Sequence, residues 1–128
     1  MSLSIYYNAT RDHPLTAAEK GIVSANLKQF SVEEKIEAYQ QTGEGWNGES
    51  YTFYTDADGD FLAGEEDQVV LEGATTLPDS SDEMTEEALQ YFCNALTQLR
   101  LAIPTLKWEV DFEDIEIKWD DSFKRYVP

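Results

Sequence analysis

The chain has 128 residues, of which 41% are hydrophobic and 12% aromatic, and this is enough apolar mass for one domain with a buried core rather than a disordered segment. Its formal net charge of −17 disfavours direct binding to nucleic acids and to anionic membranes, which are themselves negatively charged. A single cysteine and a single histidine exclude an internal disulfide and leave no ordinary zinc site.

The first 41 residues predict a strand, a helix and one ambiguous segment. Residues 3–9, "LSIYYNA", are rich in β-branched and aromatic side chains and indicate a strand. A helix is expected over residues 16–30, because Thr16 and Glu19 have the spacing of a capping box. Its apolar stripe consists of Ile22, Val23, Leu27 and Phe30. Residues 32–41 fit a helical and an alternating pattern almost equally, so either element is compatible with them.

A glycine-rich loop follows at residues 42–49, "TGEGWNGE", and carries Trp46 at its centre. Its glycines match the G-x-G-x-x-G pattern of dinucleotide sites, but no helix clearly follows and no basic residue is near, so we interpret the loop as a tight turn anchored by the tryptophan. Trp46 either covers one end of the core or is an exposed anchor for a partner.

The stretch "YTDADGDFLAGEED" lies between two segments dense in β-forming residues, 50–55 and 67–78. A helix-flanked calcium loop needs glycine at its sixth position and glutamate at its twelfth, whereas counting from Asp56 gives Phe61 and Asp67. Asp58-Gly59 is instead a strong signal for a tight turn between two strands. A weak, non-helical cation site within Asp56–Asp67 is the alternative.

The clearest helix is predicted in "DSSDEMTEEALQYFCNALTQLRLAIP", where Ser81 or Thr85 caps the start and Pro104 ends the element. Its apolar face, which we expect to pack on a sheet, consists of Leu89, Phe92, Cys93, Leu96, Leu99 and Ile103. Cys93 lies on this face and is interpreted as a buried, inert thiol.

The C-terminal tail alternates between apolar and polar residues, but the phase of the alternation changes midway. The apolar residues of its two halves are Trp108, Val110 and Phe112, followed by Ile115, Ile117 and Trp119. Both halves can face the core only if the chain turns at Glu113-Asp114, so two antiparallel strands are predicted. The outward side then presents a row of acids formed by Glu109, Asp111, Glu113 and Glu116.

These elements together predict an α+β fold: residues 1–128 form a single domain with an antiparallel sheet of about five strands and two main helices packed on one face. No run approaches the roughly 20 apolar residues of a membrane span. The start "MSLSIYYNAT" lacks the basic and apolar regions of a signal peptide, so we expect a cytoplasmic protein that does not associate with membranes.

Nearly all of the charge excess lies in the middle of the chain, because residues 36–99 contain fifteen acids and no lysine or arginine. This excess serves either solubility or the attraction of a basic protein partner. The second interpretation predicts a non-enzymatic protein-binding module without a cofactor. Its candidate contact residues are Trp46, Tyr54, Asp56, Asp58, Asp60, Glu65 and Glu66.

Two other functions are alternatives to protein binding. A domain that binds divalent cations would use the Asp56–Asp67 loop. A carboxylate-dependent hydrolase would need a pocket with two converging acids, one of them with a raised pKa. The sequence contains no serine-nucleophile motif, no histidine and acid pattern and no phosphate-binding loop, and therefore favours a protein that is not an enzyme.

The segments "GWNGESYTFY", "LEGATTLP" and "WEVDFEDIEIKW", about a quarter of the chain, resemble parts of small acidic bacterial proteins of the toxin-immunity type. Proteins of this type protect a cell by blocking a toxin directly, often a basic nuclease. The resemblance implies a cytoplasmic inhibitor with no cofactor and a basic partner protein. It assigns no functional residues.

Overall fold

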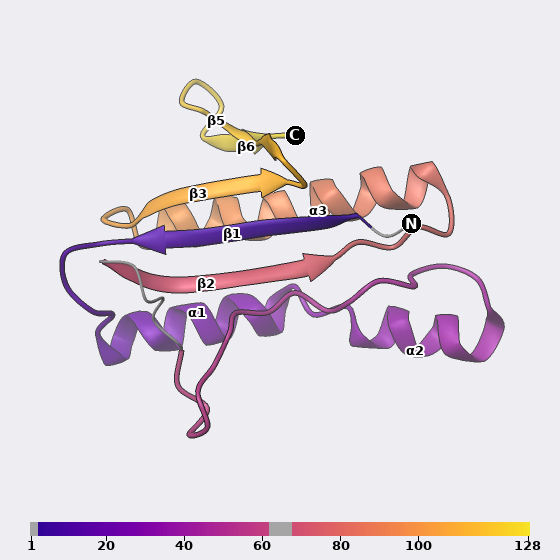
Figure 1. The fold of residues 1–128 in the computed structure, drawn as a ribbon, viewed down its shortest axis with the longest axis horizontal. Coiled ribbons are helices and arrows are strands. Elements are labelled where there is room, and N and C mark those ends of the chain that lie inside the picture. Colours follow the sequence, from indigo (N-terminus) through magenta and orange to yellow (C-terminus); the bar gives the residue numbers. More distant parts are fainter. Residues whose placement is uncertain (1–2, 62–67) are drawn as a thin grey trace.

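The computed structural model describes residues 3–61 and 68–128 and contains one main sheet, one small sheet and three helices within those residues (Figure 1). In chain order the elements are β1 (Ser4–Thr10), α1 (Ala17–Gln29), α2 (Glu33–Thr42), β2 (Val69–Thr76), α3 (Asp82–Ala102), β3 (Lys107–Phe112), β4 (Ile115–Glu116), β5 (Lys118–Asp120) and β6 (Arg125–Val127). The expected α+β class is confirmed.

The main sheet has the strand order β2-β1-β3-β4, and every neighbouring pair is antiparallel. The helix α3 connects β2 to β3 and runs behind the strands in Figure 1, so only one face of the sheet is covered by it. The prediction of about five strands in one sheet is corrected to four, with β5 and β6 forming a separate two-stranded sheet. That hairpin packs on α3 instead, where the Tyr126 amide donates to the Thr97 hydroxyl (3.1 Å).

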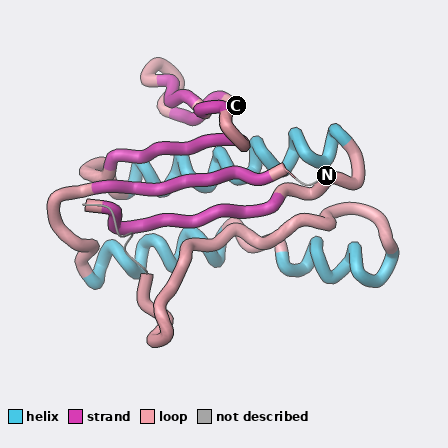
Figure 2. Tube along the Cα trace, in the orientation of Figure 1, coloured by secondary structure: helices cyan, strands magenta, loops and turns pink. Residues whose placement is uncertain are grey.

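The predicted strand over residues 50–55 is an extended segment beside β2 rather than a regular strand, visible as part of the long connection in Figure 2. The amides of Glu49 and Tyr54 donate to the carbonyls of Thr76 and Glu72 (both 2.8 Å). Between these two bonds the side chains of Tyr51 and Phe53 are buried. The segment therefore covers the outer edge of β2 and closes one side of the core.

The helices begin where local side chains satisfy free amides. Thr16 and Glu19 form the predicted capping box at the start of α1. Of the two candidate caps for α3, Ser81 accepts from the Met84 amide (3.1 Å). The ambiguous segment 32–41 is helical, although none of the residues of α2 is buried. Its weak apolar pattern thus reflects a helix that lies on the surface.

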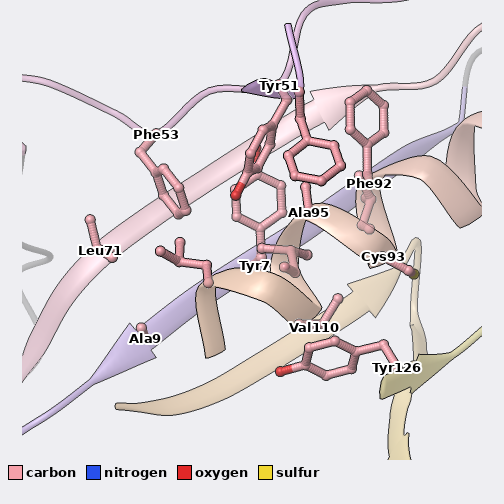
Figure 3. Close-up of a cluster of buried hydrophobic side chains, with 14 of the residues drawn as sticks. Tyr7, Ala9, Tyr51, Phe53, Leu71, Phe92, Cys93, Ala95, Val110 and Tyr126 are labelled. Atoms are coloured by element: carbon pink, nitrogen blue, oxygen red, sulfur yellow. The ribbon is translucent and has the colours of Figure 1, made fainter. Parts of the chain in front are cut away.

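The core lies between the covered face of the sheet, α3 and the segment 46–54. Figure 3 shows Tyr7, Tyr51 and Phe53 pointing toward one another, and the Tyr7 ring lies 5.7 Å and 5.2 Å from those of Tyr51 and Phe53. The Tyr7 hydroxyl bonds to the Thr52 carbonyl and to the Thr75 hydroxyl (2.8 Å). Burial raises the pKa of Tyr7 to about 12, so this hydroxyl stays protonated and can donate.

The predicted turn in the C-terminal tail is confirmed. Phe112 pairs with Ile115, and Glu113 between them has a positive φ of 54°. Val110 and Ile117 are buried, as the alternation predicts. Ile115 is 64% exposed, so its expected place in the core is wrong. The reason is that β4 is the edge strand of the sheet, where both of its residues are exposed.

Candidate functional site

The face of the sheet that α3 does not cover is acidic and contains an exposed aromatic side chain. Even-numbered residues of β1 project from this face, and Tyr6 among them is 45% exposed. We call the surface the open face and define it by Tyr6, Asn8, Glu72, Glu109, Asp111 and Glu116. Figure 1 shows no helix in front of these strands.

The register of the strands brings these residues into two rows. In the first row, Asn8 on β1 pairs with Glu72 on β2 and with Glu109 on β3. In the second row, Tyr6 pairs with Asp111, which in turn pairs with Glu116 on β4. Directly opposite side chains in a sheet lie close together, so acids distant in sequence form one surface around Tyr6 and Asn8.

The carboxylates of the open face are not neutralised by ion pairs within residues 3–61 and 68–128. The acids that do have basic partners lie elsewhere: Glu19 pairs with Arg11 (2.7 Å) and Asp60 with Lys20 (3.0 Å). Hydrogen bonds from Arg11 lower the pKa of Glu19 to about 2. Lys107, at one end of β3, is a basic residue that shares the side of the open face. The open face therefore carries concentrated negative charge.

The expectation that Trp46 is an exposed contact residue is wrong, and the alternative interpretation, that it covers the core, is correct. Its side chain is 3% exposed and lies edge-on to Tyr91 and Phe92 at 5.9 Å and 5.7 Å. A Cβ added at Gly48 would lie 2.6 Å from the Pro78 nitrogen, so the loop passes too close to the chain for a larger residue. The loop is therefore packed against the chain, and its tryptophan is part of the core, as expected for a tight turn anchored by the tryptophan.

The remaining predicted contact residues that the structure describes are exposed and share one turn. Tyr54 is 46% exposed, and Asp56, Asp58 and Asp60 follow it. The predicted tight turn is confirmed, because Thr55 bridges to Phe61 and Gly59 has a φ of +83°. Glu65 and Glu66 lie outside the described residues.

The carboxylates of this turn are partly engaged within it. One Asp56 oxygen accepts from the amides of Asp58 (2.9 Å) and Asp60 (3.0 Å), and Asp60 pairs with Lys20. Among the described residues, no group of three or more His, Cys, Asp or Glu side chains is arranged to hold a metal ion. The rest of the proposed cation loop, residues 62–67, lies outside the described residues.

The acids of residues 36–99 do not gather on a single face. Figure 1 draws the turn at residues 56–60 at its lower edge and the first turn of α3, with Asp82 and Glu83, at its right. Glu72 lies on the open face instead, across Asn8 from Glu109. The acids of the open face therefore combine Glu72, from the middle region of the chain, with the outward row of acids that was predicted from the alternating pattern of the C-terminal tail.

A hollow of about 390 Å³ adjoins the open face along the outer edge of β3. Glu109 and Glu116 line it on the open side, and Lys107 lies at its end. The helix side of the hollow is aromatic and is lined by Trp108, Trp119 and Tyr126 together with Arg100. No local sequence pattern indicates this hollow, because its walls come from α3, β3 and the terminal hairpin.

Arg100 is held by the aromatic wall rather than by a carboxylate. Its guanidinium lies 4.1 Å from the centre of the Trp119 ring and donates to the Tyr126 hydroxyl (3.2 Å). Among the described residues it forms no salt bridge, although the chain has 26 acids. Stacking on an indole face suits a planar, weakly hydrated guanidinium. Arg100 and the aromatic rings of Trp119 and Tyr126 thus hold one another in place.

The described residues contain no helix long and apolar enough to cross a membrane.

Cys93 is fully buried, and burial raises the pKa of its thiol to about 12. A thiol with this pKa is a poor nucleophile at neutral pH, as expected from its place on the apolar face of α3.

Comparisons with protein-family models, with curated proteins and with solved structures found no match.

Proposed function

We propose that this protein is a non-enzymatic binding module whose open face docks a basic partner protein. The observation that carries the proposal is the uncovered sheet face on which Glu72, Glu109, Asp111 and Glu116 surround an exposed tyrosine. Long-range attraction to such a surface speeds the encounter with a cationic protein. An immunity-type inhibitor of a basic toxin is a role that this chemistry suits.

Two further observations support an interaction surface rather than charge for solubility alone. Asp111 and Glu116 lie directly opposite each other, and two like charges in this position destabilise a sheet. A basic side chain of a partner would relieve this repulsion on binding. Tyr6 adds an amphipathic aromatic side chain, and tyrosine is enriched among the residues that dominate binding energy.

The test compares two variants that each lose three negative charges. The first carries Glu109→Gln, Asp111→Asn and Glu116→Gln on the open face, and the matched control carries Glu37→Gln, Glu86→Gln and Glu87→Gln on the helices. Basic proteins are recovered on the immobilised wild type, and their association rates are measured against ionic strength. We expect the open-face variant to associate about tenfold more slowly at low salt, with a smaller effect in the control.

An equal slowing in both variants would show that only net charge matters and would contradict the assignment of the open face. A rate that does not change with ionic strength would contradict electrostatic docking as a whole, because attraction between exposed charges is screened by salt. The acidic turn is examined in the same assay with Asp58→Asn, which we expect to have little effect.

A further inference from the structure

The outer edge of β3 presents main-chain groups that have no protein partner. The Ile117 amide donates to the Val110 carbonyl (2.8 Å), so the main-chain groups of Val110 point away from β1. The direction of the main-chain groups alternates from one residue to the next along a strand. Trp108 is two residues before Val110, so its amide and carbonyl also point outward. Among the described residues, no hydrogen bond on this edge involves the Trp108 amide or carbonyl, whereas Ile117 already lies opposite Val110.

Among the described residues, the opposite edge of the main sheet is covered, whereas the β3 edge is covered only in part. At β2 the carbonyls of Thr76 and Glu72 accept from the segment 49–54, as described above. At β3 the short strand β4 pairs with Asp111 and Phe112, and Ile117 extends this pairing to Val110. The hollow of about 390 Å³ lies along the rest of β3. Unpaired strand edges are sites at which another chain can add a strand.

We infer that this hollow receives an extended segment of the basic partner, which pairs antiparallel with β3 and continues the sheet. The inference rests on the proposed function, because that function supplies a basic protein at the adjoining open face. Antiparallel pairing is expected since every strand pair of the main sheet is antiparallel.

The two walls of the hollow predict the side-chain pattern of the added strand. Successive side chains of a strand point to opposite faces. One set would meet Glu109 and Glu116 on the open side, and the other would meet Trp119 and Tyr126 on the helix side. The segment therefore alternates basic and apolar residues.

A peptide fits the hollow better than a small ion does. The charged side chains that line it balance, with Arg100 and Lys107 against Glu109 and Glu116, so neither a simple anion nor a simple cation is favoured by charge. The outward amide and carbonyl of Trp108 require an acceptor and a donor in strand register, which the main chain of an extended peptide provides.

The probe is the heptapeptide acetyl-Lys-Val-Lys-Val-Lys-Val-Lys-amide, compared with two N-methylated forms. In antiparallel pairing, the peptide residue opposite Trp108 has its side chain on the helix side and its amide directed at β3, so the valines make the main-chain bonds. Methylation of the valine nitrogens should weaken binding about tenfold or more, whereas methylation of the lysine nitrogens, which point to solvent, should change it little.

The second readout is amide hydrogen exchange of the full chain with and without the peptide. We expect the Trp108 amide to exchange at least about tenfold more slowly at saturating peptide, because exchange requires the new pairing to open. The Tyr54 amide, already bonded to Glu72, is the internal reference and should not change.

Three outcomes would overturn the inference: equal affinity of all three peptides, no protection at Trp108, or no binding of the unmodified peptide. A greater loss on methylating the lysines would overturn the antiparallel pairing, because the amides of those residues face β3 in a parallel pair. All three peptides could bind equally, in a way that salt and the open-face substitutions both weaken. This result would support docking of a basic partner at the open face but would contradict strand addition. Conversely, the peptide could pair with β3 while the association rate of the partner is unchanged in the open-face variant. This result would contradict the proposed docking function but not strand addition.

Discussion

The two faces of β1 are made by neighbouring residues and yet have opposite roles. Tyr7 is 1% exposed and joins the aromatic core, whereas Tyr6, the preceding residue, is 45% exposed on the open face. The covered face contains apolar groups and the hydrogen-bonded Tyr7 hydroxyl, and the open face collects carboxylates that repel one another. Stability is therefore concentrated on one face of the sheet, while the other is available for recognition.

The largest expected difference between the two regions comes from removing a phenylalanine ring. Phe92 is fully buried against Trp46, Tyr51 and Tyr91, so Phe92→Ala should lower the free energy of unfolding by about 3–5 kcal/mol. The same substitution at Phe123, which is 71% exposed, should change it by no more than about 0.5 kcal/mol. Urea unfolding measures both, and similar losses would contradict the assignment of the core to the helix side.

A smaller contrast is expected between the adjacent tyrosines. Tyr7→Phe removes the hydroxyl that bonds to Thr75 and Thr52 and leaves buried groups without partners, which should cost about 1–3 kcal/mol. Tyr6→Phe removes a solvated hydroxyl and should have an effect within about 0.5 kcal/mol. Thermal and urea unfolding of the two variants would show the difference. Equal stability would mean that the Tyr7 hydroxyl has an alternative partner in solution.

The smallest effect has the opposite sign and lies on the open face. Glu116→Gln removes one of two facing acids and should raise the free energy of unfolding by about 0.2–1 kcal/mol. The gain should shrink at 1 M salt, where charges are screened within roughly 3 Å. Glu87→Gln on α3 controls for the change in net charge. If both variants gained equally, the pair with Asp111 would contribute nothing specific.

Local patterns predicted most of the elements. The capping box at Thr16 and the period of α3 identified two helices, and the change of phase near Glu113 identified the terminal turn. These features depend on residues a few positions apart, which one local conformation brings together. The weak pattern of residues 32–41 was ambiguous because α2 buries none of its residues and so has little need for an apolar face.

The candidate site was predicted only in part. The alternation of the tail placed Glu109, Asp111 and Glu116 on an outward row, but nothing local connected that row to Glu72 or Tyr6. Trp46 was equally compatible with burial and exposure, since the outcome depends on how closely its loop approaches the chain near Pro78. Arg100 lay on a predicted helix with no sign that Trp119 and Tyr126 would enclose it.

The sequence by itself determined the α+β class, the identity of most elements and the side of each strand on which a residue lies, because all three follow from short-range periodicity. The tertiary structure alone decided which strands are neighbours, which loops bury their aromatic residue and which sheet edge stays unpaired. Strand order and register are set by contacts between residues that are distant along the chain. For this reason the acidic surface and the hollow beside it exist only in the folded molecule.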